Sequence, residues 1–523
     1  GYDIFFNSDA TFANAVTFQN TGTLDLGNTT SDTLTFNGGL TENTGGTVTI
    51  DGAIVSSNDT ISFGNINLGQ NLSVTSAGGA ITIGAITSSS ARDVTISSTG
   101  GSTNTVTLST LNGGNMNTIA VTGSTSVTLN GNITTNNGSG NSVTVTGTTI
   151  NTGAITIDTN NTSNDGAINF VGSVASSNNN LALDSGSADI TLSGATFNLG
   201  SGSLTTTGDI NLATNVSITA TGGMTINDKI DADDASSNDR TLTLNSGTGA
   251  TITFNDAIGG DEALAGLTIT QSDGVTFGST LDVTDGSSGT FTVTDTEDGS
   301  DITFSGAVAL ETVSFAQTGY DLVFNGGGTF TNAATFQNTG TLNLGDASGD
   351  SFTFNGGLTE STSGTVTIDG AIVSSDDAIT FGAIVLGQNL SVTSAGGAIS
   401  IGAITGGSTF DVTITSSGGS TNTVTLSTLS GGNMNTIAVT GSTSVTLNGN
   451  ITTNNSSGNS VTVTGTTINT GAITIDTNNT SNDGAINFVG SVASSNSNLA
   501  LDSGGADITL SGGTFNLGSG SLT

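Results

Sequence analysis

The stretch Ser142–Thr159, SVTVTGTTINTGAITIDT, decides the fold class of this chain. In it, Val143 and Val145 alternate with threonines, and Ile155 and Ile157 flank another threonine. A period of two places apolar side chains on one face of a β-strand and hydroxyl side chains on the other. Val, Ile and Thr also suit a half-buried pleated surface. The stretch therefore predicts two short strands.

Turn-forming clusters separate such strands along the whole chain. Examples are NNGSGN from Asn136, TNNTSNDG from Thr159 and STGGSTN from Ser98. Gly and Asn supply the backbone conformations that turns need. The nearest approach to a helix, Asp261–Ala265, is too short and ends on Gly266. The sequence predicts an all-β protein.

Similar strands recur about every 22 to 25 residues, a typical length for one coil of a β-solenoid. They are LSVTS after Asn71, VTISS after Asp93, TIAVT after Asn117 and VTVTG after Ser142. With three strands per coil and about 4.8 Å between coils, some 21 to 24 coils would form a rod of about 100 to 115 Å. The predicted fold is an elongated, right-handed parallel β-solenoid.

Tandem β-sandwich domains are the alternative architecture, because strands about every 8 to 12 residues also suit sandwiches. The coil-like spacing, the lack of aromatic core anchors and the outward threonines favour the solenoid. The complete absence of Pro also favours the solenoid, in which almost every strand is central, because Pro would remove a ladder hydrogen bond from a central strand. Low-complexity disorder is a further alternative for a chain with 78 Gly, and the regular apolar alternation argues against it.

A long internal repeat organises the chain. GYDIFFN at Gly1 returns as GYDLVFN at Gly319, and residues 1–205 recur as residues 319–523. Residues 206–318 complete the first 318-residue unit and occur once. We therefore expect one continuous rod, cut from a longer tandem array. End-to-end assembly through open strand edges is a further hypothesis.

The charge balance limits the partners. The chain has 41 acidic and 3 basic residues, a formal charge of −38. Nucleic acid and anionic membranes would be repelled. Multivalent cations, cationic surfaces and neutral glycans are compatible with this charge. No apolar stretch approaches the roughly 18 residues that a membrane-spanning helix needs, so no span is expected.

Catalytic residue types are scarce. The chain has no His and no Cys, which removes thiolate sites, disulfides and the commonest general base. The basic residues are Arg92, Lys229 and Arg240, and Phe410 stands at the position of Arg92 in the second copy. We predict that the chain is not an enzyme. The alternative is a secreted carbohydrate-active β-helix enzyme, whose Asp pairs would meet across neighbouring coils.

Two acidic clusters are weak candidates for calcium, since oxygen ligands near a Gly turn suit Ca²⁺. Neither matches a known calcium loop, and solvated acidic turns are the competing explanation of both clusters. No other cofactor is predicted. The candidate ligands are Asp231, Asp233, Asp234 and Asp239 in DADDASSND, and Asp295, Glu297, Asp298 and Asp301 in DTEDGSD.

Ice binding is another alternative, because rows of Thr on a flat solenoid face can order water. TVTID from Thr47, SVTVTG from Ser142 and AITIDT from Ala154 would supply such rows. Outward Thr is also expected from β-propensity alone.

The segments GGDEALAGLTIT (Gly259–Thr270) and VTFGSTLDV (Val275–Val283) resemble repeats of large secreted bacterial adhesins of the filamentous haemagglutinin type. The resemblance is one of style over the whole chain, without a diagnostic motif. It implies a right-handed parallel β-helix at the cell surface that serves attachment, cell–cell contact or filament formation. Those adhesins also carry an N-terminal secretion domain, which is not visible here. We therefore expect a structural or adhesive extracellular fibre that self-associates and contacts surface glycans or other cells.

Overall fold

The computed structural model describes residues 1–100, 104–111, 116–135, 140, 142–160, 164–176, 178–233, 240–285, 289–418, 422–430, 434–454, 457–469, 471–478, 481–494 and 496–523. In these residues the regular elements are all strands, with no helix. The chain divides into two compact units, Gly1–Leu264 and Ala265–Thr523. Each is a parallel β-solenoid, and the chain makes about 21 turns.

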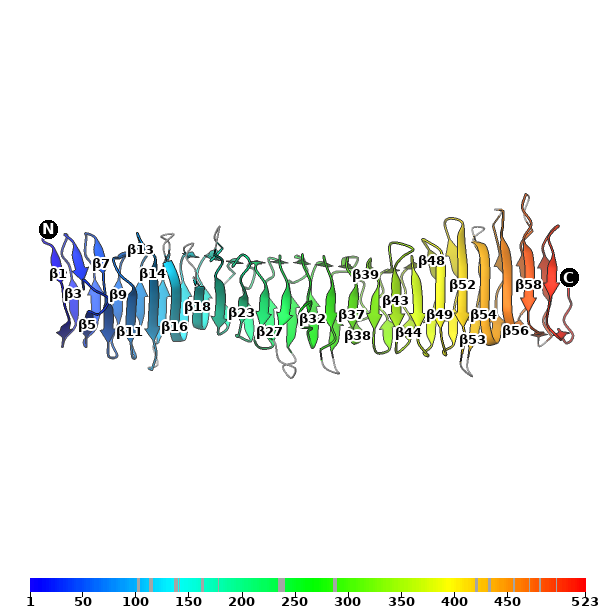
Figure 1. The fold of residues 1–523 in the computed structure, drawn as a ribbon, viewed down its shortest axis with the longest axis horizontal. Helices are drawn as coiled ribbons and strands as arrows, with labels where there is room; N and C mark the ends of the chain where they lie inside the picture. Colours follow the sequence, from blue (N-terminus) through cyan, green and yellow to red (C-terminus); the bar gives the residue numbers. More distant parts are fainter. Residues whose placement is uncertain are drawn as a thin grey trace. The chain divides into compact units, whose positions relative to one another are not determined.

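Three strands build each regular turn, and each strand pairs with its equivalent on the next turn. Figure 1 shows the strands following one another in chain order within each unit. We call the three resulting surfaces the first, second and third face.

In the first unit, the first face contains β1 (Ile4–Phe6), β4 (Leu24–Leu26), β7 (Val48–Ile50), β10 (Ile66–Leu68), β13 (Ile86–Ser88), β17 (Ile133–Thr134), β19 (Ile155–Asp158), β22 (Leu181–Asp184), β25 (Leu204–Thr207), β28 (Met224–Ile226) and β31 (Ile252–Phe254). The second contains β2 (Ala10–Phe12), β5 (Thr33–Phe36), β8 (Ala53–Ser56), β11 (Leu72–Ser76), β14 (Arg92–Ser98), β20 (Ala167–Val171), β23 (Ile190–Leu192), β26 (Ile210–Leu212) and β29 (Ile230–Ala232). The third contains β3 (Val16–Phe18), β6 (Leu40–Glu42), β9 (Ile61–Phe63), β12 (Ile81–Ile83), β15 (Thr105–Leu108), β21 (Val174–Ala175), β24 (Thr196–Asn198), β27 (Val216–Thr219) and β30 (Thr241–Asn245). The long strands β16 (Met116–Leu129) and β18 (Ser142–Asn151) run from the second face into the third.

In the second unit, the first face contains β33 (Val275–Phe277), β36 (Asp301–Phe304), β39 (Asp321–Phe324), β42 (Leu342–Leu344), β45 (Val366–Ile368), β48 (Ile384–Leu386), β51 (Ile404–Gly406), β55 (Ile451–Thr452), β57 (Ile473–Asp476) and β60 (Leu499–Asp502). The second contains β34 (Leu281–Val283), β37 (Val308–Leu310), β40 (Gly328–Phe330), β43 (Ser351–Phe354), β46 (Ala371–Ser374), β49 (Leu390–Ser394), β52 (Phe410–Ser416), β58 (Ala485–Val489) and β61 (Ile508–Leu510). The third contains β32 (Gly266–Gln271), β35 (Thr290–Val293), β38 (Thr312–Phe315), β41 (Ala334–Phe336), β44 (Leu358–Glu360), β47 (Ile379–Phe381), β50 (Ile399–Ile401), β53 (Thr423–Leu426), β59 (Val492–Ser494) and β62 (Phe515–Asn516). Here β54 (Met434–Leu447) and β56 (Ser460–Asn469) run from the second face into the third.

Strand pairing confirms the predicted solenoid. Within each unit the described strands pair in parallel, as in the register Leu24↔Val48 between β4 and β7. Sandwiches are built from antiparallel sheets, so the sandwich alternative is wrong. The coil length is less regular than predicted. Thr49 pairs with Asn67 across a short coil, whereas Met224 pairs with Ile252 across a much longer one.

The interior is apolar and contains aromatic stacks, so the expected lack of aromatic core anchors is wrong. Phe12 and Phe36 are register partners on neighbouring turns, and their rings lie 4.8 Å apart and 5° from parallel. Phe330 and Phe354 repeat this stack in the second unit, at 4.7 Å and 14°. The reason is that an in-register parallel ladder places identical inward side chains directly above one another.

Stacked glycines form the corner between the second and third faces. A Cβ atom on Gly147 would overlap the carbonyl oxygen of Gly123 on the preceding turn, and one on Gly172 would meet the carbonyl oxygen of Gly147. Gly147 also has φ of +110°, a conformation that favours glycine. Gly465 repeats the overlap and has φ of +115°. The chain therefore makes this corner with glycines that lie in register.

The strand boundaries recur with the sequence repeat. β14 begins at Arg92 and its counterpart β52 at Phe410, while β16 begins at Met116 and β54 at Met434. Both pairs are displaced by the interval that separates Gly1 from Gly319, so these strands begin at equivalent positions of the two copies.

Candidate functional site

A concave acidic site lies where three consecutive turns carry charged residues just before β23, β26 and β29. These residues are Asp189, Asp209 and Lys229. The amide of Ile190 donates to the carbonyl of Asp209, and the amide of Ile210 to the carbonyl of Lys229. The ladder thus stacks the three charged residues on successive turns.

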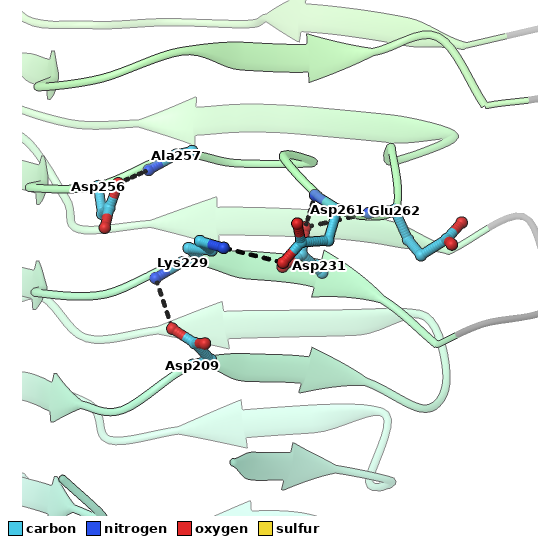
Figure 2. Close-up of polar contacts among 7 residues, drawn as sticks. All are labelled: Asp209, Lys229, Asp231, Asp256, Ala257, Asp261 and Glu262. Atoms are coloured by element: carbon cyan, nitrogen blue, oxygen red, sulfur yellow. Dashed lines mark hydrogen bonds and ion pairs between the residues drawn. The ribbon is translucent and has the colours of Figure 1, made fainter. Parts of the chain in front are cut away.

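A groove of about 200 Å³ opens beside this stack. Asp231 on β29 accepts hydrogen bonds from the amides of Asp261 (3.0 Å) and Glu262 (3.3 Å), which holds a loop against the strand (Figure 2). The groove lining includes Asp189, Asp209, Asn211, Asp231, Asp261 and Glu262.

One lysine partly balances these carboxylates. The Nζ atom of Lys229 lies 2.8 Å from Oδ2 of Asp261, and its amide donates to Oδ1 of Asp209 at 3.3 Å (Figure 2). The side chain of Asp261 is 70% exposed, so the ion pair is screened by solvent and adds little stability. The hydrogen bond to Asp261 raises the pKa of Lys229, which keeps the lysine charged.

Burial raises the pKa of Asp209, opposed by the amide and charge of Lys229. Because its lining carries five carboxylates beside one ammonium group, the groove attracts cations and repels anions. The carboxylates of Asp209 and Asp231 are, however, already engaged by backbone amides.

The first predicted calcium cluster is only partly described, because Asp234 and Asp239 lie outside the described residues. Asp231 lines the groove. Asp233 instead forms a two-pronged ion pair with Arg240, with Nε–Oδ1 at 2.5 Å and Nη2–Oδ2 at 2.7 Å. The hydrogen bonds to Arg240 lower the pKa of Asp233. Asp231 therefore binds the backbone amides of the loop at Asp261, whereas Asp233 binds Arg240.

The second predicted cluster lies on the connection from β35 to β36 and on the first residue of β36, Asp301. Oδ1 of Asp298 accepts a hydrogen bond from the amide of Gly319 at 2.9 Å, and Asp301 is the register partner of Asp321. Asp295 and Glu297 lie on the same connection. Across the described part of the chain, no three acidic side chains are grouped closely enough to hold a metal ion. Calcium binding at either cluster stays a prediction.

Sequence reasoning missed a pair of buried glutamates. Glu42 and Glu360 end corresponding strands and are each 6% exposed. The Oε2 atom of Glu42 accepts the amide of Gly64 at 2.9 Å, and Glu360 accepts that of Gly382 at the same distance. The signal was available, because Glu42 has the inward parity of Leu40. Each of these carboxylates therefore accepts a hydrogen bond from the backbone of the next turn.

Threonine columns line the outer surface. On the third face, Thr17, Thr41, Ser62, Thr82, Thr107 and Thr128 are successive register partners. Of the threonines proposed for ice binding, Thr49 and Thr156 lie on the first face, and Thr144 and Thr146 on the second. Ice binding stays a prediction.

The described residues contain no helix long and apolar enough to cross a membrane. Comparisons of the chain with protein-family models, curated proteins and solved structures found no match, so the chain is identified only as far as its architecture, a long parallel β-solenoid with tandem repeating turns.

Proposed function

We propose that the chain is a structural or adhesive part of an extracellular fibre. The observation that carries the proposal is the recurrence of the same strands in both copies of the tandem unit, with turns joined by parallel backbone ladders. Such an architecture lengthens by repetition, because each turn needs only its neighbours for stability.

The surface chemistry supports the same proposal. The outward columns consist largely of Thr, Ser and Asn, and the charge of −38 keeps the chain soluble and apart from nucleic acid and anionic lipid. Neutral glycans and the surfaces of other cells are the proposed partners. A parallel ladder can also be extended by the edge strand of another copy, which makes end-to-end association part of the proposal.

Two experiments on cells that produce the protein test this role. Protease treatment of intact cells should remove the protein from the cell surface, and deletion of its gene should reduce attachment to glycan-coated surfaces or to other cells. A protein that is protected until the cells are lysed, together with unchanged attachment, would overturn the proposal.

A further inference from the structure

We propose that a neutral groove on the first face of the first unit binds an uncharged sugar ring of a glycan. The inference rests on the proposed function and assigns its glycan contact to one place on the chain. The groove has a volume of about 230 Å³ and an uncharged lining. Pockets for drug-sized ligands hold roughly 300 to 1,000 Å³, so this smaller groove suits a single ring. We call it the neutral groove, and its polar side chains are those of Thr47, Asn65, Asn67 and Thr87.

The neutral groove lies at a step in the corner that leads onto the first face. The connection from β6 to β7, residues 43–47, is longer than the connection from β9 to β10, residues 64–65. A long connection beside a short one leaves a recess between turns. Thr47 from the long connection and Asn65 from the short one both line it. Ile66 also lines it and is buried, so the base of the groove belongs to the packed interior.

The side chains of the neutral groove offer both hydrogen-bond donors and acceptors. Oδ1 of Asn65 accepts the amide of Ala85 at 2.9 Å, which leaves the Nδ2 group of Asn65 as a donor. The hydroxyl of Thr87 donates to the carbonyl of Ile66 at 3.3 Å, so its oxygen can still accept. Asn67 alternates with buried neighbours on β10, and its side-chain amide has no hydrogen-bond partner among the described residues. A sugar hydroxyl both donates and accepts, so it can bind each of these groups.

Charge disfavours ionic ligands in the neutral groove. The chain carries −38, so anions are repelled. The lining has no carboxylate to attract a cation, unlike the groove at Asp209 and Asp231. The nearest carboxylate in the outward column of this face is Asp25, which lies two turns from Asn67 because Thr49 stands between them in the register. An uncharged ligand is therefore favoured.

A peptide is a poorer ligand for this site. Recognition of an extended peptide commonly adds a strand to a free sheet edge. Here β7 pairs with β4 and β10, and β10 also pairs with β13. Their backbone groups are therefore occupied on both sides, and binding depends on side chains. This arrangement favours a molecule that is dense in hydroxyl groups.

The second unit has the same step without the asparagines. The connections from β44 to β45 and from β47 to β48 have the same lengths as their counterparts in the first unit. Ala383 and Val385 stand in place of Asn65 and Asn67. Val385 is 37% exposed, so an apolar side chain lies where the first unit presents an amide. We therefore expect the saccharide to bind in the first unit and not at the equivalent place in the second.

Saturation-transfer NMR of the whole purified chain tests the inference. The probes are three neutral trisaccharides, built from glucose, mannose and N-acetylglucosamine. Glycerol serves as a polyol without a ring, and sialyllactose as an anionic sugar. We expect saturation to reach at least one neutral trisaccharide and neither glycerol nor sialyllactose. Titration of the signal then gives the dissociation constant.

Matched variants locate the site. Asn65→Ala with Asn67→Val gives the first unit the residues of the second, so this asparagine variant should fold, and circular dichroism checks that it does. We expect its affinity for the bound trisaccharide to fall about tenfold or more, because two amide groups are lost. The control, Thr60→Ala with Ser62→Thr, also introduces second-unit residues on the same turn, at positions that do not line the groove. Its affinity should equal that of the parent chain.

Transfer of the site gives a second test. Adding Ala383→Asn and Val385→Asn to the asparagine variant should restore binding, now in the second unit. The inference would be overturned if none of the three neutral trisaccharides bound the parent chain, or if glycerol bound as well as they do. Equal affinities of the parent and the asparagine variant, or equal losses in that variant and the control, would also contradict it. All these measurements use purified chain, so their failure leaves surface location and attachment to other cells untouched, and the two proposals fail separately.

Discussion

Phe304 and Phe324 stack on neighbouring turns of the second unit, with ring centroids 4.4 Å apart and ring planes 5° from parallel. They are register partners, and both are fully buried. We expect Phe324→Ala to lower the free energy of unfolding by about 3 to 5 kcal/mol, because it removes a buried ring and leaves a cavity. Urea unfolding followed by circular dichroism measures the loss. The control Phe5→Ala, at a position 56% exposed, should change stability by about 0.5 kcal/mol or less. Equal effects of the two substitutions would contradict the register assigned to the stack.

The stacked glycine corner gives a second prediction. Gly147→Ala should lower the free energy of unfolding by about 1 to 3 kcal/mol. The new Cβ atom would meet the carbonyl oxygen of Gly123, and residue 147 has a φ of +110°, which strains any residue other than glycine. Gly153→Ala is the matched control, because nothing lies within 4 Å of a Cβ at that position. Thermal unfolding compares the two variants. A corner that tolerates alanine at residue 147 as well as at residue 153 would refute the close approach of neighbouring turns.

Stability should rise as the pH is lowered from 7 towards about 4. Burial is the main cause that raises the pKa of Asp51, Asp158, Asp209 and Asp369 above the ordinary value of 3.8. A raised carboxyl pKa means that the folded chain binds more protons than the unfolded chain, so stability falls as the pH rises through the folded-state values. The stabilising effect of these groups is fully present below the ordinary pKa. Asp32 and Asp233 have lowered pKa values, so their contribution is lost as the pH falls further. Melting temperatures measured from pH 3 to 8 at constant ionic strength test this, and a maximum above pH 7 would contradict it.

Asp25→Asn should stabilise the folded chain at pH 7. Burial and the charge of Asp51 raise the pKa of Asp25, and its Oδ1 atom is buried without a hydrogen-bond partner. The second copy carries Asn343 at the same position, so the ladder accommodates the amide. The stabilising effect should vanish near pH 3, where Asp25 is largely protonated in both states. A variant that is less stable than the parent at pH 7 would show that the charge of Asp25 is favourable.

The fold followed from local pattern, because period-2 alternation and turn clusters recur along the chain. The length of each coil could not be predicted from this pattern. The connections between strands vary in length while the strands stay in register, as in the long coil between Met224 and Ile252. Aromatic stacking was missed for the same reason. More residues separate Phe12 from Phe36 than separate Phe304 from Phe324, so no fixed sequence spacing predicts which phenylalanines stack.

The acidic groove could not be predicted from the sequence either. Asp209, Asp231 and Asp261 meet because of the ladder register and a loop, and their unequal spacings along the chain share no period. The predicted clusters instead grouped residues close in sequence. Near neighbours in the chain, such as Asp231 and Asp233, have separate partners once the turns stack. Proximity along a solenoid strand is therefore a poorer guide to a site than proximity across turns.

Immunogold electron microscopy of intact cells that produce this protein tests the proposed fibre most directly. Antibodies against an exposed segment, such as the one around Asp261, would mark its location. The proposed function predicts gold particles in rows along filaments outside the cell, at intervals that repeat with the tandem unit. Labelling confined to the cell interior, or to isolated particles without filaments, would contradict it.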